Sequence, residues 1–176
     1  MKNKTLSSET VYKGRVFDVV KSKIREDDSE YEREVITHNG SAAIVPVIGE
    51  TVILVKQYRH PAKKYLLELP AGSVEDGETP LECAFREVEE EIGMKAETME
   101  KLTEFYVSPG FLSEKMHLFL ATDLIKSEQN LDEDENISLV KMSLVDAFEK
   151  VRNNEIEDAK TMLGLVFAGK RFGLDF

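Results

Sequence analysis

The feature that most constrains the fold is a pair of apolar runs, residues 42–48 and 51–57, which are separated by Gly49-Glu50. A two-residue connection that contains glycine is typical of a β-hairpin, because glycine adopts the positive φ angles that tight turns require. The sequence therefore predicts two adjacent antiparallel strands here, to which the other elements must be added.

The remaining segments predict a chain of mixed secondary structure. Two acidic, polar segments, residues 25–32 and 127–136, lie between apolar runs, and each is interpreted as a loop or a strand connection. Strands are predicted at residues 10–22, 31–37, 65–69, 102–107, 116–122 and 137–142, and helices at residues 80–91, 144–153 and 158–172. Strands grouped with a few helices favour an α/β or α+β fold, in which a sheet packs between helices.

Length, charge and cysteine content limit the class of protein. The 176 residues contain no internal repeat and no Pro/Gly/Ser-rich linker, so we expect one domain, residues 1–176. The net charge of -11 argues against nucleic-acid and anionic-membrane partners, which need clustered Lys and Arg. No apolar run is long enough for a membrane helix or a secretory signal. Cys83 is the single cysteine, which excludes an internal disulfide and favours a cytoplasmic protein.

Residues 79–93 carry the start and stop signals of one helix. Thr79 can cap the N-terminus, Pro80 fits the first helical position, and Glu82 completes a capping box. Gly93 supplies the stop. On a helix with about 100° per residue, the apolar face that we expect to be buried consists of Leu81, Ala84, Phe85, Val88 and Ile92.

Three carboxylates, Glu87, Glu90 and Glu91, share a stripe at the border of that face. Charge runs are usually a solvated helix face, and that interpretation stays open. However, no Lys within the helix follows at i+4, and like charges at this spacing cost about 0.2–0.5 kcal/mol per pair. The stripe also follows a strand break at residues 70–72, whose backbone carbonyls are available as ligands. Clustered carboxylate and carbonyl oxygens suit Mg²⁺ or Mn²⁺.

The order of residues in this region resembles the Nudix box. The match covers 23 positions and consists of Gly72, five residues, Glu78, seven residues, Arg86-Glu87-Val88, one residue, Glu90-Glu91, one residue and Gly93-Met94. The resemblance implies a Nudix fold, which is an α/β/α sandwich with a mixed sheet between helices and, here, an N-terminal antiparallel strand pair. It also implies hydrolysis of a nucleoside diphosphate linked to another moiety.

Within the box, the resemblance implies a site for divalent cations. Glu87 and Glu91 resemble the principal metal ligands of the family, and Glu90 resembles a further ligand that takes part in catalysis. The backbone carbonyl of Ala71 resembles the main-chain ligand. The implied cofactor is Mg²⁺, with Mn²⁺ as the alternative.

Other box residues resemble residues with supporting roles. Arg86 resembles the arginine that orients the catalytic glutamates through salt bridges, and Glu78 is its expected partner. Gly72 and Gly93 resemble glycines whose role is geometric.

Outside the box, the chain is similar to the ADP-ribose pyrophosphatase branch over nearly its whole length. Pro109, which lies 15 residues after Met94, is similar to a substrate marker of that branch. Arg59, at the end of the segment QYR, resembles an arginine that contacts the diphosphate. Arg33 resembles an arginine that reaches the substrate across a dimer interface. A turn at Pro109 and surface charges at the two arginines are the simpler interpretations.

The acidic residues 131–136 match a glutamate-rich loop of the same branch, which supplies a catalytic base or a metal ligand. Glu133 and Glu135 both match it, and the acidic repeat leaves open which of them acts. Glu114 also matches a glutamate near the site.

The resemblance thus implies the metal-dependent hydrolysis of ADP-ribose to AMP and ribose 5-phosphate. It further implies a homodimer that exchanges its N-terminal strands, residues 1–38, around a catalytic core of residues 39–176. One alternative is a hydrolase of another nucleoside diphosphate sugar, such as ADP-glucose or GDP-mannose. A second is a non-catalytic Nudix domain that senses nucleotides, although the intact box glutamates argue against it.

Overall fold

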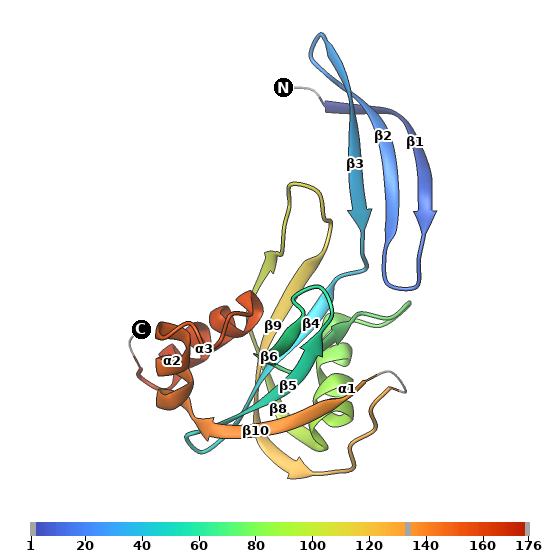
Figure 1. Cartoon of the computed structure of the whole chain (residues 1–176). Coiled ribbons are helices and arrows are strands. Elements are labelled where there is room, and N and C mark those ends of the chain that lie inside the picture. The colour runs from blue at the N-terminus through green and yellow to red at the C-terminus, as the bar shows by residue number, and fades with distance from the viewer. Residues whose placement is uncertain (1–2, 133–134, 175–176) are drawn as a thin grey trace. The chain divides into compact units, whose positions relative to one another are not determined.

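The computed structural model describes residues 3–132 and 135–174 (Figure 1). Glu133, one of the two candidate loop glutamates, lies outside the described residues. The chain divides into two compact units. Unit 1 contains the N-terminal residues up to Gly40 and the segment Phe105–Lys115, and unit 2 contains Ser41–Glu104 and the residues from Met116 onward. None of the helices in the described ranges is both long and apolar enough to cross a membrane.

Unit 1 is built on a three-stranded antiparallel sheet, whose strands are β1 (Asn3–Lys13), β2 (Asp18–Glu26) and β3 (Ser29–Thr37). The predicted antiparallel pairing at the N-terminus is confirmed. The single strand predicted at residues 10–22 is wrong, because the chain turns between β1 and β2, where the Gly14 N–H donates to the Phe17 carbonyl oxygen at 3.1 Å. The segment 105–115 joins this sheet at β3, where the Ile36 N–H donates to the Phe111 carbonyl oxygen at 2.7 Å.

The predicted connection between two strands at residues 25–32 is confirmed in place, but it is much shorter than predicted. β2 continues to Glu26 and β3 begins at Ser29, so that a two-residue turn connects them. Charges on the two strands compensate each other: Arg25 lies opposite Glu30 in the ladder, and Lys23 Nζ lies 2.7 Å from Glu30 Oε2. Opposite charges across a strand pair stabilise it. An acidic composition therefore indicated a longer connection where the charges are in fact paired across a hairpin.

Unit 2 contains a seven-stranded mixed sheet in the order β10-β5-β4-β9-β8, with β6 paired to β5 and β7 paired to β4. Its strands are β4 (Ser41–Ile48), β5 (Thr51–Arg59), β6 (Lys64–Glu68), β7 (Ala71–Ser73), β8 (Met94–Tyr106), β9 (Lys115–Lys126) and β10 (Ile137–Ser143). The predicted hairpin is confirmed, since Val47 of β4 lies opposite Val52 of β5 and Gly49 adopts a φ of 60°. β4 pairs with β9 in parallel and with β7 in antiparallel orientation, which makes the sheet mixed.

Helices cover both faces of this sheet (Figure 1), and they are α1 (Pro80–Ile92), α2 (Leu144–Arg152) and α3 (Ala159–Arg171). Ala42 and Ile44 of β4 pack in one core cluster with Val88 of α1. On α3, a side chain at Gly164 would lie 3.1 Å from Val45. Because successive residues of a strand point to opposite faces, α1 and α3 lie on opposite sides of β4. The predicted sandwich of a mixed sheet between helices is confirmed.

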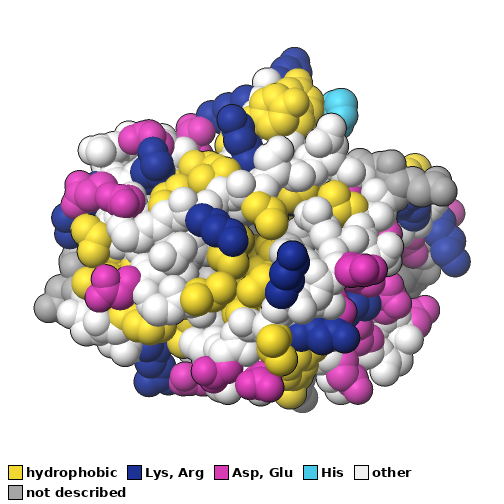
Figure 2. Space-filling view, turned by 90° about the horizontal axis from the view of Figure 1, so that it is seen from below, with side chains coloured by type: hydrophobic (Ala, Val, Ile, Leu, Met, Phe, Trp, Pro, Cys, Tyr) yellow, Lys and Arg dark blue, Asp and Glu magenta, His cyan; other side chains and the backbone are white. Residues whose placement is uncertain are grey.

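The surface of the molecule mixes apolar and charged side chains. Figure 2 shows one face, on which hydrophobic side chains emerge between scattered Lys and Arg, while Asp and Glu gather toward the margin. Exposed hydrophobic side chains of unit 2 include Ile48, Leu139 and Phe172. On this face, acidic side chains thus lie mostly around an apolar centre.

Candidate active site

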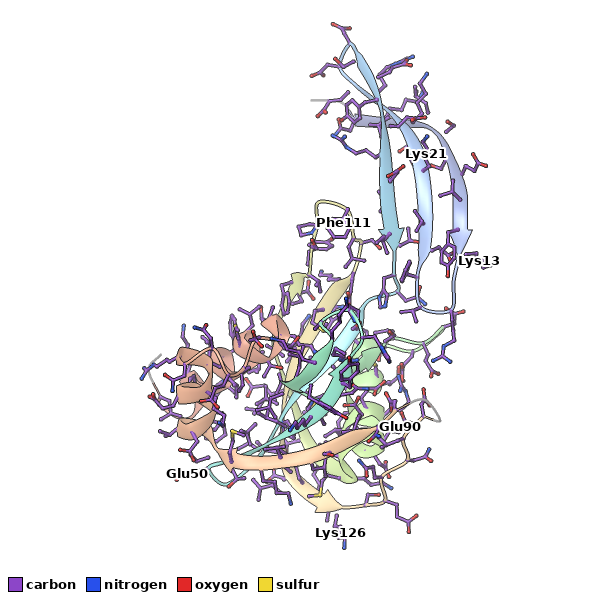
Figure 3. All side chains as sticks on the ribbon, viewed as in Figure 1. Lys13, Lys21, Glu50, Glu90, Phe111 and Lys126 are labelled. Atoms are coloured by element: carbon purple, nitrogen blue, oxygen red, sulfur yellow. The ribbon has the colours of Figure 1, made fainter. Side chains whose placement is uncertain are left out.

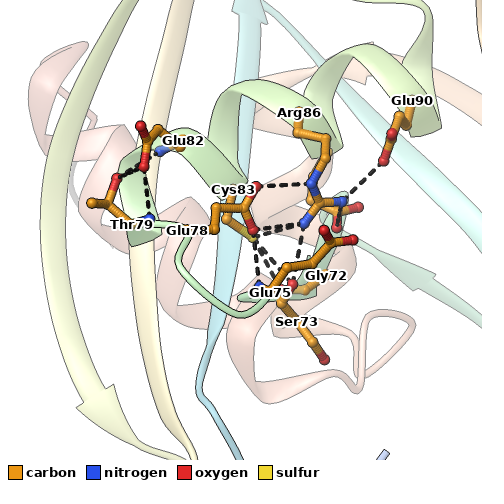
Figure 4. Close-up of polar contacts among 10 residues, drawn as sticks. Gly72, Ser73, Glu75, Glu78, Thr79, Glu82, Cys83, Arg86 and Glu90 are labelled. Carbon is orange, nitrogen blue, oxygen red and sulfur yellow. Dashed lines mark hydrogen bonds and ion pairs between the residues drawn. The ribbon is translucent and has the colours of Figure 1, made fainter. Parts of the chain in front are cut away.

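α1 begins at the predicted residue and carries the predicted capping box. Thr79 Oγ1 accepts a hydrogen bond from the Glu82 N–H at 3.3 Å, and Glu82 Oε2 accepts one from the Thr79 N–H at 2.8 Å (Figure 4). At the other end, Gly93 adopts a φ of 64° and donates its N–H to the Glu89 carbonyl oxygen at 2.9 Å. Both helix ends are therefore fixed by local hydrogen bonds.

The buried face of α1 differs from the predicted one. Leu81 and Phe85 are 43% and 38% exposed, whereas Glu87 and Glu91 are 8% and 3% exposed. The helix is rotated so that two carboxylates lie inside its buried face instead of at the border. A helical wheel drawn from apolar residues missed this rotation because it placed every charged residue outside the core.

Arg86 connects three carboxylates. Its Nε and Nη2 donate to Glu78 Oε1 and Oε2 at 2.9 and 3.0 Å (Figure 4). Its Nη1 donates to Glu87 Oε1 at 2.6 Å and to Glu90 Oε2 at 3.0 Å. A bidentate pair fixes the plane of a guanidinium group. Glu78 therefore aims Nη1 at the carboxylates of α1, which is the arrangement that an orienting arginine needs.

Burial and repulsion shift the protonation of the two buried glutamates. Burial raises the pKa of Glu87 to about 7, although the charge of Arg86 opposes the shift. Burial and the charge of Glu87 raise the pKa of Glu91 to about 8, although the Ala71 N–H donates to Glu91 Oε2 at 3.0 Å. The charge of Glu135 also contributes to both upward pKa shifts. A cation at this place would remove the repulsion.

The donor atoms fit a divalent cation by their chemistry. Glu87, Glu90, Glu91 and the Ala71 carbonyl offer hard oxygen atoms, which Mg²⁺ and Mn²⁺ prefer. A Cβ atom on Gly72 would lie 1.8 Å from Glu87 Oε1, so the glycine leaves the space that this carboxylate occupies. In the part of the chain that the structure describes, no three His, Cys, Asp or Glu side chains form a ready metal site.

Arg59 lies at the end of β5 and pairs with Glu68. Its Nε and Nη2 donate to Glu68 Oε1 and Oε2 at 2.7 and 2.8 Å. The charge of Glu91 also acts on Arg59 and helps to raise the pKa of its guanidinium, after the larger effect of the Glu68 hydrogen bonds. The residue predicted to contact the diphosphate is thus an ordered cation near the carboxylates of α1.

The segment after β9 is fastened to the C-terminal end of α1. The bonds run from Ser127 N to Gly93 O at 2.8 Å, from Asn130 N to Glu90 O at 3.0 Å and from Gln129 Nε2 to Glu91 O at 2.6 Å. They satisfy carbonyl groups that a helix end otherwise leaves unpaired. The chain re-enters the sheet at Ile137, opposite Gln57 of β5. The acidic stretch that contains Glu135 is therefore anchored at both ends.

The other predicted substrate residues, Arg33, Pro109 and Glu114, all belong to unit 1. Arg33 is exposed on β3, and its guanidinium carbon lies 4.3 Å from the centre of the Tyr31 ring. Pro109 is exposed, and the Glu114 carbonyl oxygen accepts a hydrogen bond from the Val107 N–H at 3.2 Å. The structure thus groups these three residues in one unit, and the box glutamates with Arg59 in the other.

A family model described as "NUDIX domain" matches residues 37–163. The chain belongs to the NUDIX family. This NUDIX protein is similar to the ADP-ribose pyrophosphatase of Bacillus subtilis (strain 168), with 37% identity over 171 residues that cover 95% of this chain and 92% of the relative. It is also similar to the methanol dehydrogenase activator of Bacillus methanolicus, with 38% identity over 173 residues, 93% of this chain and 91% of the relative.

The fold of this NUDIX protein is similar to that of a solved structure as well. The crystal structure of an ADP compounds hydrolase matches it with a TM-score of 0.88 and 25% sequence identity, covering 98% of this chain and 95% of the other. The likeness extends over both units, since it includes nearly all of the chain.

Two charged residues of this NUDIX protein, Glu68 and Lys160, were not predicted from the sequence. Glu68 is 1% exposed and accepts hydrogen bonds from both Arg59 and Lys160. One signal was available for Glu68, because it interrupts the apolar segment 65–69 and a buried charge needs partners. Lys160 carried no such signal, since its partner lies 92 positions away along the chain.

Proposed function

We propose that this NUDIX protein hydrolyses ADP-ribose with water to AMP and ribose 5-phosphate. The observation that carries the proposal is the buried pair Glu87 and Glu91, which repel each other beside the backbone of Ala71. The similarity to an ADP-ribose pyrophosphatase over nearly the whole chain supports this substrate. The single cysteine supports a cytoplasmic location.

The cation site of this proposal consists of Glu87, Glu90, Glu91 and the Ala71 carbonyl oxygen. Mg²⁺ or Mn²⁺ held by these oxygen atoms would neutralise charge on the diphosphate and make water a better nucleophile. Arg86 holds two of these carboxylates in place through Nη1.

The protein's other groups bind the diphosphate and accept a proton. Arg59 donates charge-assisted hydrogen bonds to diphosphate oxygens. A carboxylate oxygen of Glu133 or Glu135 accepts the proton of the attacking water, while one P–O bond of the anhydride breaks. The effect of the Glu135 charge on Glu87 and Glu91 supports Glu135 for this role.

The substrate is tested by assaying AMP release from ADP-ribose, ADP-glucose, GDP-mannose, NADH and diadenosine polyphosphates with Mg²⁺ (GMP release for GDP-mannose). We expect kcat/KM for ADP-ribose to exceed that for every other compound by about tenfold or more, which corresponds to about 1.4 kcal/mol of transition-state binding. Preference for another sugar nucleotide would support hydrolysis of a diphosphate but reject ADP-ribose as the preferred substrate. Tight binding of ADP-ribose without any turnover would instead indicate a nucleotide sensor.

A homodimer completes the proposal, with Arg33 of one protomer reaching the substrate of the other. Light scattering after gel filtration is expected to give twice the chain mass of 20.0 kDa at micromolar concentration. Co-expression of Arg33→Ala and Glu91→Gln chains with different tags is expected to yield heterodimers that are more active than either variant alone, because one of their two sites carries neither substitution. A monomer, or heterodimers without this gain, would contradict the role of Arg33.

A further inference from the structure

The most deeply buried charge in the described part of unit 2 is that of Glu68, which is 1% exposed at the end of β6. Two cations bind it. Arg59 donates to both of its oxygens, and Lys160 Nζ donates to Oε2. Burial alone would raise the pKa of Glu68, but the hydrogen bonds from Arg59 and the charge of Lys160 outweigh burial and lower it. Glu68 is thus held as a carboxylate, at a place where a neutral side chain would cost less desolvation.

The pair leaves one edge of the Arg59 guanidinium available. Nε and Nη2 are both used by Glu68, and Nη1 has no hydrogen bond to the described residues. The Arg59 side chain is 39% exposed, whereas that of Glu68 is 2% exposed. One edge of the guanidinium is therefore fixed in the protein, while Nη1 stays available for a further acceptor. The charge of Glu91 also acts on this cation. Such a fixed, planar donor suits an oxygen-rich anion.

A ring of polar contacts locks Glu68 in turn. Lys160 Nζ also lies 3.1 Å from Asp158 Oδ2, and Asp158 caps α3 by accepting from the Thr161 N–H at 3.0 Å. Thr161 Oγ1 accepts from the Leu69 N–H at 2.8 Å, which closes the ring at the residue after Glu68. Because each member is held by at least two contacts, the carboxylate has little freedom to rotate.

We propose that Glu68 is a positioning residue that fixes Arg59 so that Nη1 meets the diphosphate of the substrate, and that Lys160 holds Glu68 from the other side. The inference rests on the proposed function, because it assigns Arg59 to a diphosphate. It assigns Glu68 and Lys160 no contact with substrate. Their effect reaches the substrate through Arg59.

The test is a double-mutant cycle measured as KM and kcat. Glu68→Gln is expected to raise KM for ADP-ribose about tenfold with kcat changed less than about threefold, because Gln offers one acceptor where Arg59 needs two. Lys160→Met is expected to raise KM by a smaller factor, since Arg59 still holds the carboxylate. In an Arg59→Ala background, neither change is expected to alter KM further, because no guanidinium remains to be positioned.

The chain provides a matched control. Lys64 and Glu157 also join β6 to the start of α3, but their side chains are 49% and 47% exposed. Glu157→Gln should leave both KM and kcat unchanged, since exposed ion pairs contribute little. If Glu68→Gln fails to fold, the double variant Glu68→Gln with Lys160→Met removes one charge of each sign and serves in its place.

Two results would overturn the inference. One is a KM for Glu68→Gln equal to that of the Glu157→Gln control. The other is an equal rise in KM when Glu68→Gln is introduced into the Arg59→Ala background, which would mean that Glu68 acts independently of Arg59. The cycle uses whichever substrate the panel identifies, or the affinity for ADP, which contains the diphosphate, if nothing is hydrolysed. If ADP-ribose is not hydrolysed in the panel, the proposed function is rejected. The double-mutant cycle still tests whether Glu68 positions Arg59.

Discussion

Glu91→Gln is expected to remove most of the turnover and to stabilise the metal-free protein at the same time. The substitution takes away one charge of the proposed cation site, and the loss of one electrostatic group that stabilises a transition state typically costs about 100-fold or more in kcat. It also removes a buried charge whose pKa is raised to about 8, while the amide oxygen can still accept the Ala71 N–H. In a protein of this size, each kcal/mol gained raises Tm by about 2–4 °C.

The measurement combines AMP release with thermal unfolding in EDTA at pH 8.5, where Glu91 is mostly charged in the wild type. Glu89→Gln is the control on the same helix. Glu89 is partly exposed and binds Ser127 and Lys95, so its loss should leave kcat unchanged. A Glu91→Gln protein that is both active and less stable would show that this carboxylate has a structural role.

Removal of divalent cations is expected to abolish turnover and to make stability strongly dependent on pH. The pKa of Glu87 and of Glu91 is raised in the folded protein from an ordinary 4.5 to about 7 and about 8. Between pH 4.5 and 8, the folded state therefore binds more protons than the unfolded state, and the free energy of unfolding falls as pH rises. Cations bind the deprotonated carboxylates, so the gain in Tm from Mg²⁺ is expected to grow from pH 6 to pH 9.

Thermal unfolding in EDTA and in Mg²⁺ across this pH range gives both quantities. Other groups titrate as well, so the wild type is compared with the double variant Glu87→Gln and Glu91→Gln, and the difference isolates the pair. The part of the pH dependence of Tm that comes from the pair should be absent in the variant. The increase of Tm with Mg²⁺ should be absent as well. An enzyme that keeps its full activity in excess chelator, or a Tm gain that is independent of pH, would contradict the cation site.

Local signals allowed parts of the fold and of the site to be predicted from the sequence. The turn at Gly49, the cap at Thr79 and the stop at Gly93 depend on neighbouring residues, and all three are found where the sequence predicts them. The helical wheel placed Glu87 and Glu91 on one stripe of the helix, but their burial depends on how α1 rotates against the sheet, which no local signal encodes.

Contacts between distant residues account for what was missed. The charges of Arg25 and Glu30 predicted a longer connection because their pairing across a hairpin was not considered. The ring around Glu68 joins β6 to α3, which are far apart in the sequence. The sequence therefore shows a charge within an apolar segment but does not show which residues pair with it. Arg59 was found from a motif, but the motif carried no information on which edge of its guanidinium is occupied.

The attachment of residues 127–130 to the end of α1 has a consequence for how such an enzyme could diversify. The acidic stretch starts after Asn130, whose N–H is bonded to the end of α1, and it returns to the sheet at Ile137. Its two ends are therefore set by elements that do not depend on its length. Lengthening a loop between fixed ends costs little, about 0.6 kcal/mol for each doubling. Insertions and replacements in this stretch can therefore accumulate over generations, while its two attachment points and the buried glutamates of α1 keep their places.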